Sequence, residues 1–212
     1  QISMSLKNSK GQIRKNKMIS KSTDRNKKQI MWFVEPKDDK GIAFLKLEEF
    51  NKDTQMKMWL PAFKKVRRIT AKKKGDSFMG SDLSFEDLST RVLDDYNYTL
   101  MKDTVYNDQE AYLLEIKPKA KLKSSYSKHI TIVDKSQLLT KEELSFNKKG
   151  ILEKKKIFSY SKIDDYFIIV KIFVIDIQKD HSTLVEFSNI KLDDMLNDKL
   201  FHEKNLQRLP EY

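Results

Sequence analysis

The sequence predicts a mostly β protein whose strands form an antiparallel meander, and three observations point to this class. Turn signals such as NSKG at 8–11, NKKG at 147–150 and QKDH at 178–181 recur at short intervals along the chain. The runs between them are short and rich in Ile, Val, Phe, Tyr and Thr, which favour strands. The intervals are also too short for the crossover segments of a dozen or more residues that parallel strands require.

The N-terminal half contributes seven expected strands. In the first of them Ile2, Met4 and Leu6 alternate with polar residues, which is the pattern of a strand with one buried face. Met56 and Met58 show the same alternation shortly before a proline. We expect these strands at 1–8, 12–22, 28–35, 42–49, 54–60, 64–70 and 96–104.

The C-terminal half contributes six more expected strands, at 110–117, 126–133, 137–147, 150–161, 166–178 and 182–190. The run YFIIVKIFVIDIQ at 166–178 differs from the others because apolar side chains fall on both of its faces. A strand with one wet face would alternate more cleanly. We therefore expect helices or a cavity to cover this strand on both sides.

Helical signals are confined to two segments. SFED, which begins at Ser84, resembles a capping box that opens a short helix ending near Leu93. The acidic start of 193–206 suits the N-terminus of a second helix. Both helices would be accessories to the sheet.

The composition indicates a folded chain with one domain, 1–212. Charged residues make up 34% of the 212 residues and apolar residues 39%, so the chain can build a core from short strands. No window approaches the roughly 18 uninterrupted apolar residues of a membrane-spanning helix. Because Gln1 falls inside the first alternating pattern, we expect an N-terminal segment, and any signal peptide, to be missing.

The net charge of +11 is segregated along the chain. Residues 1–74 carry 21 Lys and Arg against seven Asp and Glu, whereas 75–116 carry two against ten. One interpretation is a basic surface that contacts anionic lipid headgroups. The other is a Lys-rich chain whose strands need polar residues on their solvated faces. Nucleic-acid binding is not expected, because no aromatic strand motif, zinc spacing or basic helix accompanies the charge.

The residues that an enzyme would need do not form a recognisable set. His129, His181 and His202 lack the short spacings of metal ligands, and the chain has no cysteine. No G-x-S-x-G elbow and no glycine-rich phosphate loop is present. We therefore predict no catalytic site, metal or cofactor, and an esterase would require a triad assembled from distant residues.

The most informative stretch joins WLPAFKKVRRI, from Trp59, to GDSFMGSDLSFEDL, from Gly75. This stretch resembles the signature of the LolA-like outer-membrane lipoprotein-sorting proteins, in the branch associated with RND-type lipid exporters. EPKDDKGIAFL before it and LVEFSNIKLDDMLNDKLFHEKNLQR near the C-terminus also resemble that branch, although these flanking matches are degenerate.

The resemblance implies a strongly curved antiparallel sheet, an incomplete barrel with a few short helices on its concave side, that encloses a cavity for acyl chains. It implies a periplasmic carrier or accessory whose partners are a lipid or lipoprotein acyl chain and an RND-type transporter. The alternative is a non-catalytic adaptor whose sheet is closed by its own side chains and which docks a membrane transporter without carrying lipid.

Alternation and the architecture implied by the resemblance together select ten residues as the cavity lining, and an ordinary core is an equally good interpretation of each. Methionine favours an adaptable surface because its flexible thioether fills irregular space. The ten residues are Trp32, Val34, Phe44, Met56, Met58, Leu60, Ile168, Val170, Ile172 and Val174.

The loop after the basic run contains Phe78 and Met79, which a merely solvated loop would not need. Arg67 and Arg68 are adjacent, so on a strand one of them should face inward. An inward guanidinium requires a carboxylate, and the loop offers two of them. We hypothesise that an arginine fixes the loop over the cavity mouth as a latch, or forms a static ion pair that stabilises it. The candidate carboxylates are Asp82 and Glu86.

Overall fold

The computed structural model describes residues 1–49, 54–192 and 195–210. Its strands are β1 (Ile2–Lys7), β2 (Ile13–Thr23), β3 (Lys28–Glu35), β4 (Ala43–Leu47), β5 (Gln55–Leu60), β6 (Lys65–Ile69), β7 (Tyr96–Tyr106), β8 (Gln109–Pro118), β9 (Tyr126–Asp134), β10 (Thr140–Asn147), β11 (Leu152–Ile163), β12 (Tyr166–Asp176) and β13 (His181–Phe187). Five short 3₁₀ helices accompany them: η1 (Pro61–Phe63), η2 (Ala71–Lys73), η3 (Leu93–Asp95), η4 (Asp198–Leu200) and η5 (Glu203–Gln207).

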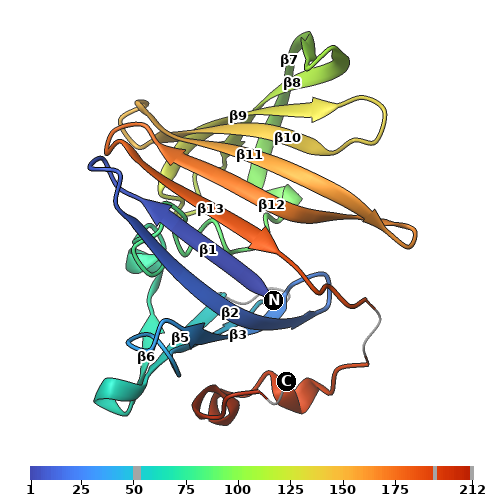
Figure 1. Cartoon of the computed structure of the whole chain (residues 1–212). Coiled ribbons are helices and arrows are strands. Elements are labelled where there is room, and N and C mark those ends of the chain that lie inside the picture. The colour runs from blue at the N-terminus through green and yellow to red at the C-terminus, as the bar shows by residue number, and fades with distance from the viewer. Residues whose placement is uncertain (50–53, 193–194, 211–212) are drawn as a thin grey trace.

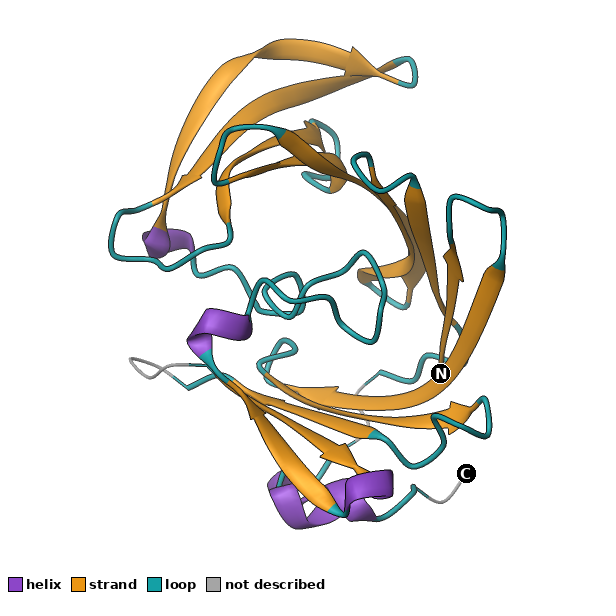
Figure 2. Ribbon diagram, turned by 90° about the vertical axis from the view of Figure 1, so that its left-hand side faces the viewer, coloured by secondary structure: helices purple, strands orange, loops and turns teal. Residues whose placement is uncertain are grey.

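All thirteen strands join one antiparallel sheet that is not closed into a barrel. Neighbours in the sheet are neighbours in sequence, except that β1 pairs with β13. β6 and β7 therefore form the two ends of the sheet. The sheet curves strongly, with β5 and β6 at the lower end and β7 and β8 arching over the top (Figures 1 and 2). The predicted fold class and all thirteen strand positions are confirmed.

The two predicted α-helices are not formed as expected. Ser84 and Asp87 do make the local capping contacts, since the Ser84 amide donates to the Asp87 carboxylate over 2.8 Å and the Asp87 amide donates to Ser84 Oγ over 3.2 Å. The chain then continues as turns, because a helix this short is marginal. The second prediction covers η4 and η5, while 193–194 lie outside the described residues.

The lower half of the concave side is filled by residues 74–92, which we call the inner loop. Its Phe78 and Phe85 pack edge to face, with ring centroids 5.7 Å apart, and Phe44 of β4 lies 5.3 Å from Phe78. These rings join side chains of β1, β3, β5 and β12 in a buried inner core. In Figure 2 loops occupy the space between the lower and upper parts of the sheet. The inner loop thus takes the place that helices were expected to fill.

The C-terminal segment covers the opposite, outer face of β3, β4 and β5. Trp32 is buried there with Phe201 and Leu206, and its indole Nε1 donates to the Asn205 carbonyl over 3.1 Å. An ion pair of 2.7 Å between Lys57 and Glu203 adds a second attachment. In Figure 1 this segment lies beneath the sheet.

The prediction that both faces of β12 are covered is wrong for its first half. Tyr166 and Phe167 are 57% and 39% exposed, whereas Val174 near the other end is fully buried. The inner loop reaches only the second half of the strand, since Val174 belongs to the inner core and Ile172 packs against it. Apolar side chains of the first half therefore remain open to solvent.

Within the described part of the chain, no helix is long and apolar enough to cross a membrane.

Candidate functional site

The inner loop is attached to the sheet by Asp87, whose side chain is buried. The Asp87 carboxylate accepts hydrogen bonds from Lys156 Nζ and, over 2.9 Å, from the Tyr126 hydroxyl. Lys154 Nζ lies 3.4 Å from the same carboxylate and donates to Tyr126 over 3.0 Å. Because Lys154 and Lys156 are alternate residues of β11, both ammonium groups reach the concave side.

The positive charges of neighbouring lysines determine the protonation state of the Asp87 carboxyl. Burial alone would raise the pKa of the Asp87 carboxyl, but Lys156 and Lys154 outweigh burial and hold that pKa well below its usual range. Asp87 is therefore ionised at neutral pH, and the inner loop is held by a buried ionic contact.

A second buried carboxylate, Glu143 of β10, continues the network. Arg91, at the end of the inner loop, donates two hydrogen bonds to it, of 2.9 and 3.2 Å, in the bidentate geometry that favours this pair. Lys156 lies 3.2 Å from Glu143 and so bridges the two carboxylates. Burial would raise the Glu143 pKa, yet Lys156 and Arg91 hold the pKa below its usual range. The Arg91 guanidinium also stacks over the Tyr96 ring at 5.3 Å.

His129 lies beside this network and is held neutral. Its Nδ1 is 2.9 Å from Ser145 Oγ, and its ring meets Tyr126 edge to face. Burial lowers the His129 pKa to about 4, with Arg91 contributing in the same direction against the attraction of Glu143. His129 is therefore an uncharged hydrogen-bonding residue at neutral pH.

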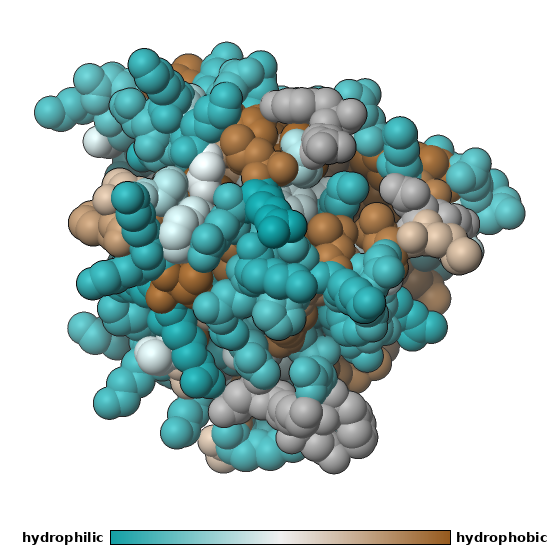
Figure 3. Space-filling view, turned by 90° about the horizontal axis from the view of Figure 1, so that it is seen from below, coloured by the Kyte–Doolittle hydropathy of each residue, from teal (hydrophilic) through white to brown (hydrophobic). Residues whose placement is uncertain are grey.

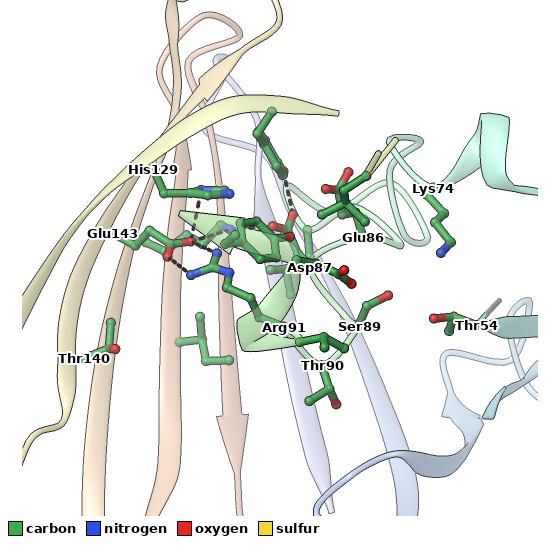
Figure 4. A pocket seen from close by; sticks show the side chains of 18 of the residues that line it. Thr54, Lys74, Glu86, Asp87, Ser89, Thr90, Arg91, His129, Thr140 and Glu143 are labelled. Carbon is green, nitrogen blue, oxygen red and sulfur yellow. Dashed lines mark hydrogen bonds and ion pairs between the residues drawn. The ribbon is translucent and has the colours of Figure 1, made fainter. Parts of the chain in front are cut away.

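These groups form one wall of a pocket of about 350 Å³ between the inner loop and the sheet (Figure 4). Figure 4 shows Arg91 pointing toward Glu143, with Lys74, Thr54 and Ser89 on the other side of the space. The pocket also has an apolar wall on β11 and β12. That wall consists of Phe158, Tyr160, Ile169 and Ile172.

The predicted arginine latch is not formed. Arg67 and Arg68 are both exposed, and neither makes an ion pair with any residue that the structure describes. Asp82 instead accepts a hydrogen bond from Thr183 over 2.6 Å and lies 2.7 Å from His181 Nδ1, both on β13. The loop carboxylates are thus satisfied by the sheet.

Glu86 is also held by a neighbour other than arginine. Its carboxylate accepts hydrogen bonds from Ser124 Oγ over 2.5 Å and from the Ser125 amide over 2.6 Å. Of the other loop residues, Phe78 is in the inner core and Met79 packs against that core. The loop is fixed, but by serine, threonine, histidine and lysine partners that the sequence did not single out.

The ten predicted lining residues are dispersed. Phe44, Met56, Met58 and Val174 belong to the inner core, and Leu60 and Ile172 pack against it. Val34, Ile168 and Val170 belong to neither core cluster. Ile172 is the one member of the ten that lines the pocket.

Trp32 does not share a face of the sheet with the other predicted lining residues. Its neighbours Met31 and Phe33 take the inner side of β3, so Trp32 points to the outer core under the C-terminal segment. The prediction of which β12 side chains face inward is also wrong in part. A β-bulge near Val170 brings both Ile169 and Ile172 to the pocket, so that Ile168 falls on the other face.

Several pocket residues were missed by the sequence analysis. Two signals in the sequence could have identified them: the alternating Lys154 and Lys156 of β11, and Arg91 after the SFED stretch. Lysines that alternate on the inward face of a strand require buried carboxylates as partners. The missed residues include Asp87, Arg91, Glu143, Lys156, Phe158, Tyr160 and Ile169.

The chain is similar to proteins of known structure over nearly its whole length. A domain from Vibrio parahaemolyticus described as an outer membrane lipoprotein-sorting protein is 29% identical, with a TM-score of 0.91, and the match covers 98% of this chain and 89% of that one. A LolA superfamily protein from Nitrosomonas europaea has a TM-score of 0.77 at 18% identity, over 96% of this chain and 89% of that one, which shows the shared fold. None of the curated proteins matches this sequence.

The family itself follows from two further matches. A family model whose members are described only as an uncharacterized protein matches residues 25–208. A DUF1329 family protein from Desulfovibrio piger is 31% identical, with a TM-score of 0.88, over 97% of this chain and 89% of that one. The chain therefore belongs to the DUF1329 family and has the LolA-like fold.

Proposed function

We propose that this protein is a periplasmic carrier or accessory that binds a lipid or lipoprotein acyl chain and passes it toward the outer membrane. The observation that carries the proposal is the pocket of about 350 Å³ with an apolar wall on β11–β12 and polar groups opposite. Its volume falls in the range of roughly 300–1,000 Å³ common for small-ligand sites. Similarity to a protein described as lipoprotein-sorting supports an acyl chain as the ligand.

The apolar surface continues beyond the pocket, which a long chain requires. Tyr96 of β7 lines the pocket, and Tyr98 and Leu100 follow it at alternate positions of the same strand. They are 42% and 57% exposed, so the inner loop leaves them uncovered. An acyl chain seated against Ile169 can extend along this surface and bury it.

Energetics place a condition on the mechanism. Each methylene removed from water contributes about 0.8 kcal/mol, so a long acyl chain gains much by entering the pocket from solution. A bilayer offers nearly the same gain. Exchange between membrane and pocket is therefore close to neutral in hydrophobic terms, and a partner must drive loading and release. We propose an RND-type membrane transporter in this role.

The packed inner core favours one alternative, an adaptor that docks a membrane transporter without carrying lipid. The aromatic side chains of the inner loop fill the lower half of the concave side, as an adaptor closed by its own side chains would require. Native mass spectrometry of protein purified from its own host, followed by solvent extraction, separates the two. One lipid or acylated peptide per chain supports the carrier. A ligand-free mass that persists after incubation with lipid vesicles contradicts it and favours the adaptor.

A further inference from the structure

A strongly basic segment borders the open end of the sheet at β6. Residues 64–74 contain seven Lys and Arg and no Asp or Glu. We call this segment the basic rim. Arg67, Arg68, Lys72 and Lys73 are exposed, and no ion pair joins any of them to another described residue. This concentration of unpaired positive charge in one short segment favours an anionic partner.

The basic rim leads directly to the pocket. Lys74 lines the pocket, and its carbonyl accepts a hydrogen bond of 2.7 Å from the amide of Glu86 in the inner loop. A second basic segment, 119–123, reaches the same place, because Lys123 also lines the pocket. The two segments meet where Gly75 packs so closely on Ser125 that a Cβ atom would collide with it. Cations of both segments thus reach the pocket where the segments meet.

An exposed aromatic residue lies at the far end of the basic rim. Phe63, in the turn between β5 and β6, is 70% exposed, and Lys64 beside it adopts the left-handed conformation that turns the chain into β6. Figure 3 views this lower end of the molecule, where hydrophilic side chains surround separate hydrophobic patches. An exposed aromatic ring among lysines matches the interface of a bilayer, where rings lie at headgroup depth and cations contact lipid phosphates.

We propose that the basic rim and Phe63 dock this protein on an anionic lipid bilayer, with the pocket turned toward the headgroups. The docking itself is independent of cargo, and only the passage of cargo from the bilayer into the pocket rests on the proposed function. Lysine and arginine contribute attraction to the surface, and Phe63 enters the interface. Docking of this kind places the pocket beside the lipid that a carrier must receive.

The test is flotation of the purified protein with vesicles of phosphatidylcholine alone or mixed with phosphatidylglycerol. We expect binding to the anionic vesicles that is lost at high salt. Replacing Arg67 and Arg68 with Gln should lower the partition coefficient roughly thirty-fold, since each nearby cation contributes about a five-fold factor. The matched control replaces Lys148 and Lys149, which are exposed in the β10–β11 turn, with Gln and should have little effect.

Phe63 has its own control. Phe63→Ser should weaken binding to anionic vesicles several-fold, whereas Leu138→Ser, at another exposed turn, should not. Equal binding to neutral and anionic vesicles, or an equal loss in the Lys148/Lys149 control, would overturn the docking proposal. Binding of a fluorescent fatty acid in the absence of vesicles tests the carrier function separately, so that failure of one proposal is distinguishable from failure of the other.

Discussion

The Asp87 carboxylate lies against the Lys156 ammonium inside the curved sheet, and this contact joins residues 69 positions apart in sequence. It attaches the inner loop to β11 at the edge of the pocket. The same lysine bridges to Glu143, which in turn holds Arg91. Loop position and pocket shape therefore depend on one buried ionic network.

Removing the charge of Asp87 should destabilise the protein strongly. Asp87→Asn leaves two buried ammonium groups with less compensation, and breaking a buried pair in this way costs about 3–5 kcal/mol. Urea unfolding measures the change. Asp198→Asn is the control, because Asp198 pairs with Lys28 at 70% exposure and should cost less than about 1 kcal/mol. Equally small losses for both variants would show that the network does not anchor the loop.

His129 should make stability depend on pH between about 6.5 and 4. The folded pKa of about 4 lies below the ordinary value, so the unfolded chain binds a proton in this window before the folded chain does. Stability therefore falls as pH decreases through the window, by about 3 kcal/mol in total. His129→Asn, measured by urea unfolding at pH 7 and pH 4.5, should remove most of this loss. An unchanged loss in the variant would assign it to other groups.

The filling of the inner core by the loop is tested by Phe78→Ala. Phe78 is buried between Phe44 and Phe85, so truncation leaves a cavity and should cost about 3–5 kcal/mol. Phe63→Ala is the control for an exposed ring and should change stability by less than about 0.5 kcal/mol. Thermal unfolding of the two variants gives the comparison. A loop that only rests on the sheet would give similar values for both.

Attachment of the C-terminal segment depends on the indole of Trp32. Trp32→Phe keeps an aromatic ring but removes the donor to Asn205, which should cost about 1 kcal/mol and loosen the segment locally. Hydrogen exchange of η5 should increase in this variant. Trp59→Phe is the matched control, because Trp59 packs on the same outer core. Its indole makes no hydrogen bond to any residue that the structure describes. Equal exchange in both variants would contradict the role of the indole.

Strand positions could be predicted because they depend on local patterns. Alternation such as that of Met56 and Met58, together with turn signals, marks each strand without reference to the rest of the chain. The curvature and the incomplete closure of the barrel were implied by the resemblance of the central signature to LolA-like proteins, whereas the identity of the end strands, β6 and β7, was not predicted. The capping signal at Ser84 was real, but whether a helix grows from such a signal depends on tertiary packing.

The residues that line the pocket could not be predicted, because its walls depend on contacts between distant segments. The β-bulge near Val170 exchanges the faces of Ile168 and Ile169, and sequence alternation alone gives no sign of it. The choice of His181 and Thr183 as partners of Asp82, in place of Arg67 or Arg68, follows from which strand the inner loop meets. Sequence reasoning identified the loop and its carboxylates but assigned them the wrong partners.

The carrier function is tested most directly by filling the pocket at Ile169. Binding of a fluorescent sixteen-carbon fatty acid to wild type should reach one molecule per chain, and Ile169→Trp should weaken it at least ten-fold because the indole occupies the acyl site. Ile168→Trp, one residue away on the opposite face, should bind like wild type. If Ile169→Trp binds as tightly as Ile168→Trp, or wild type binds no acyl chain, the proposed carrier site is wrong.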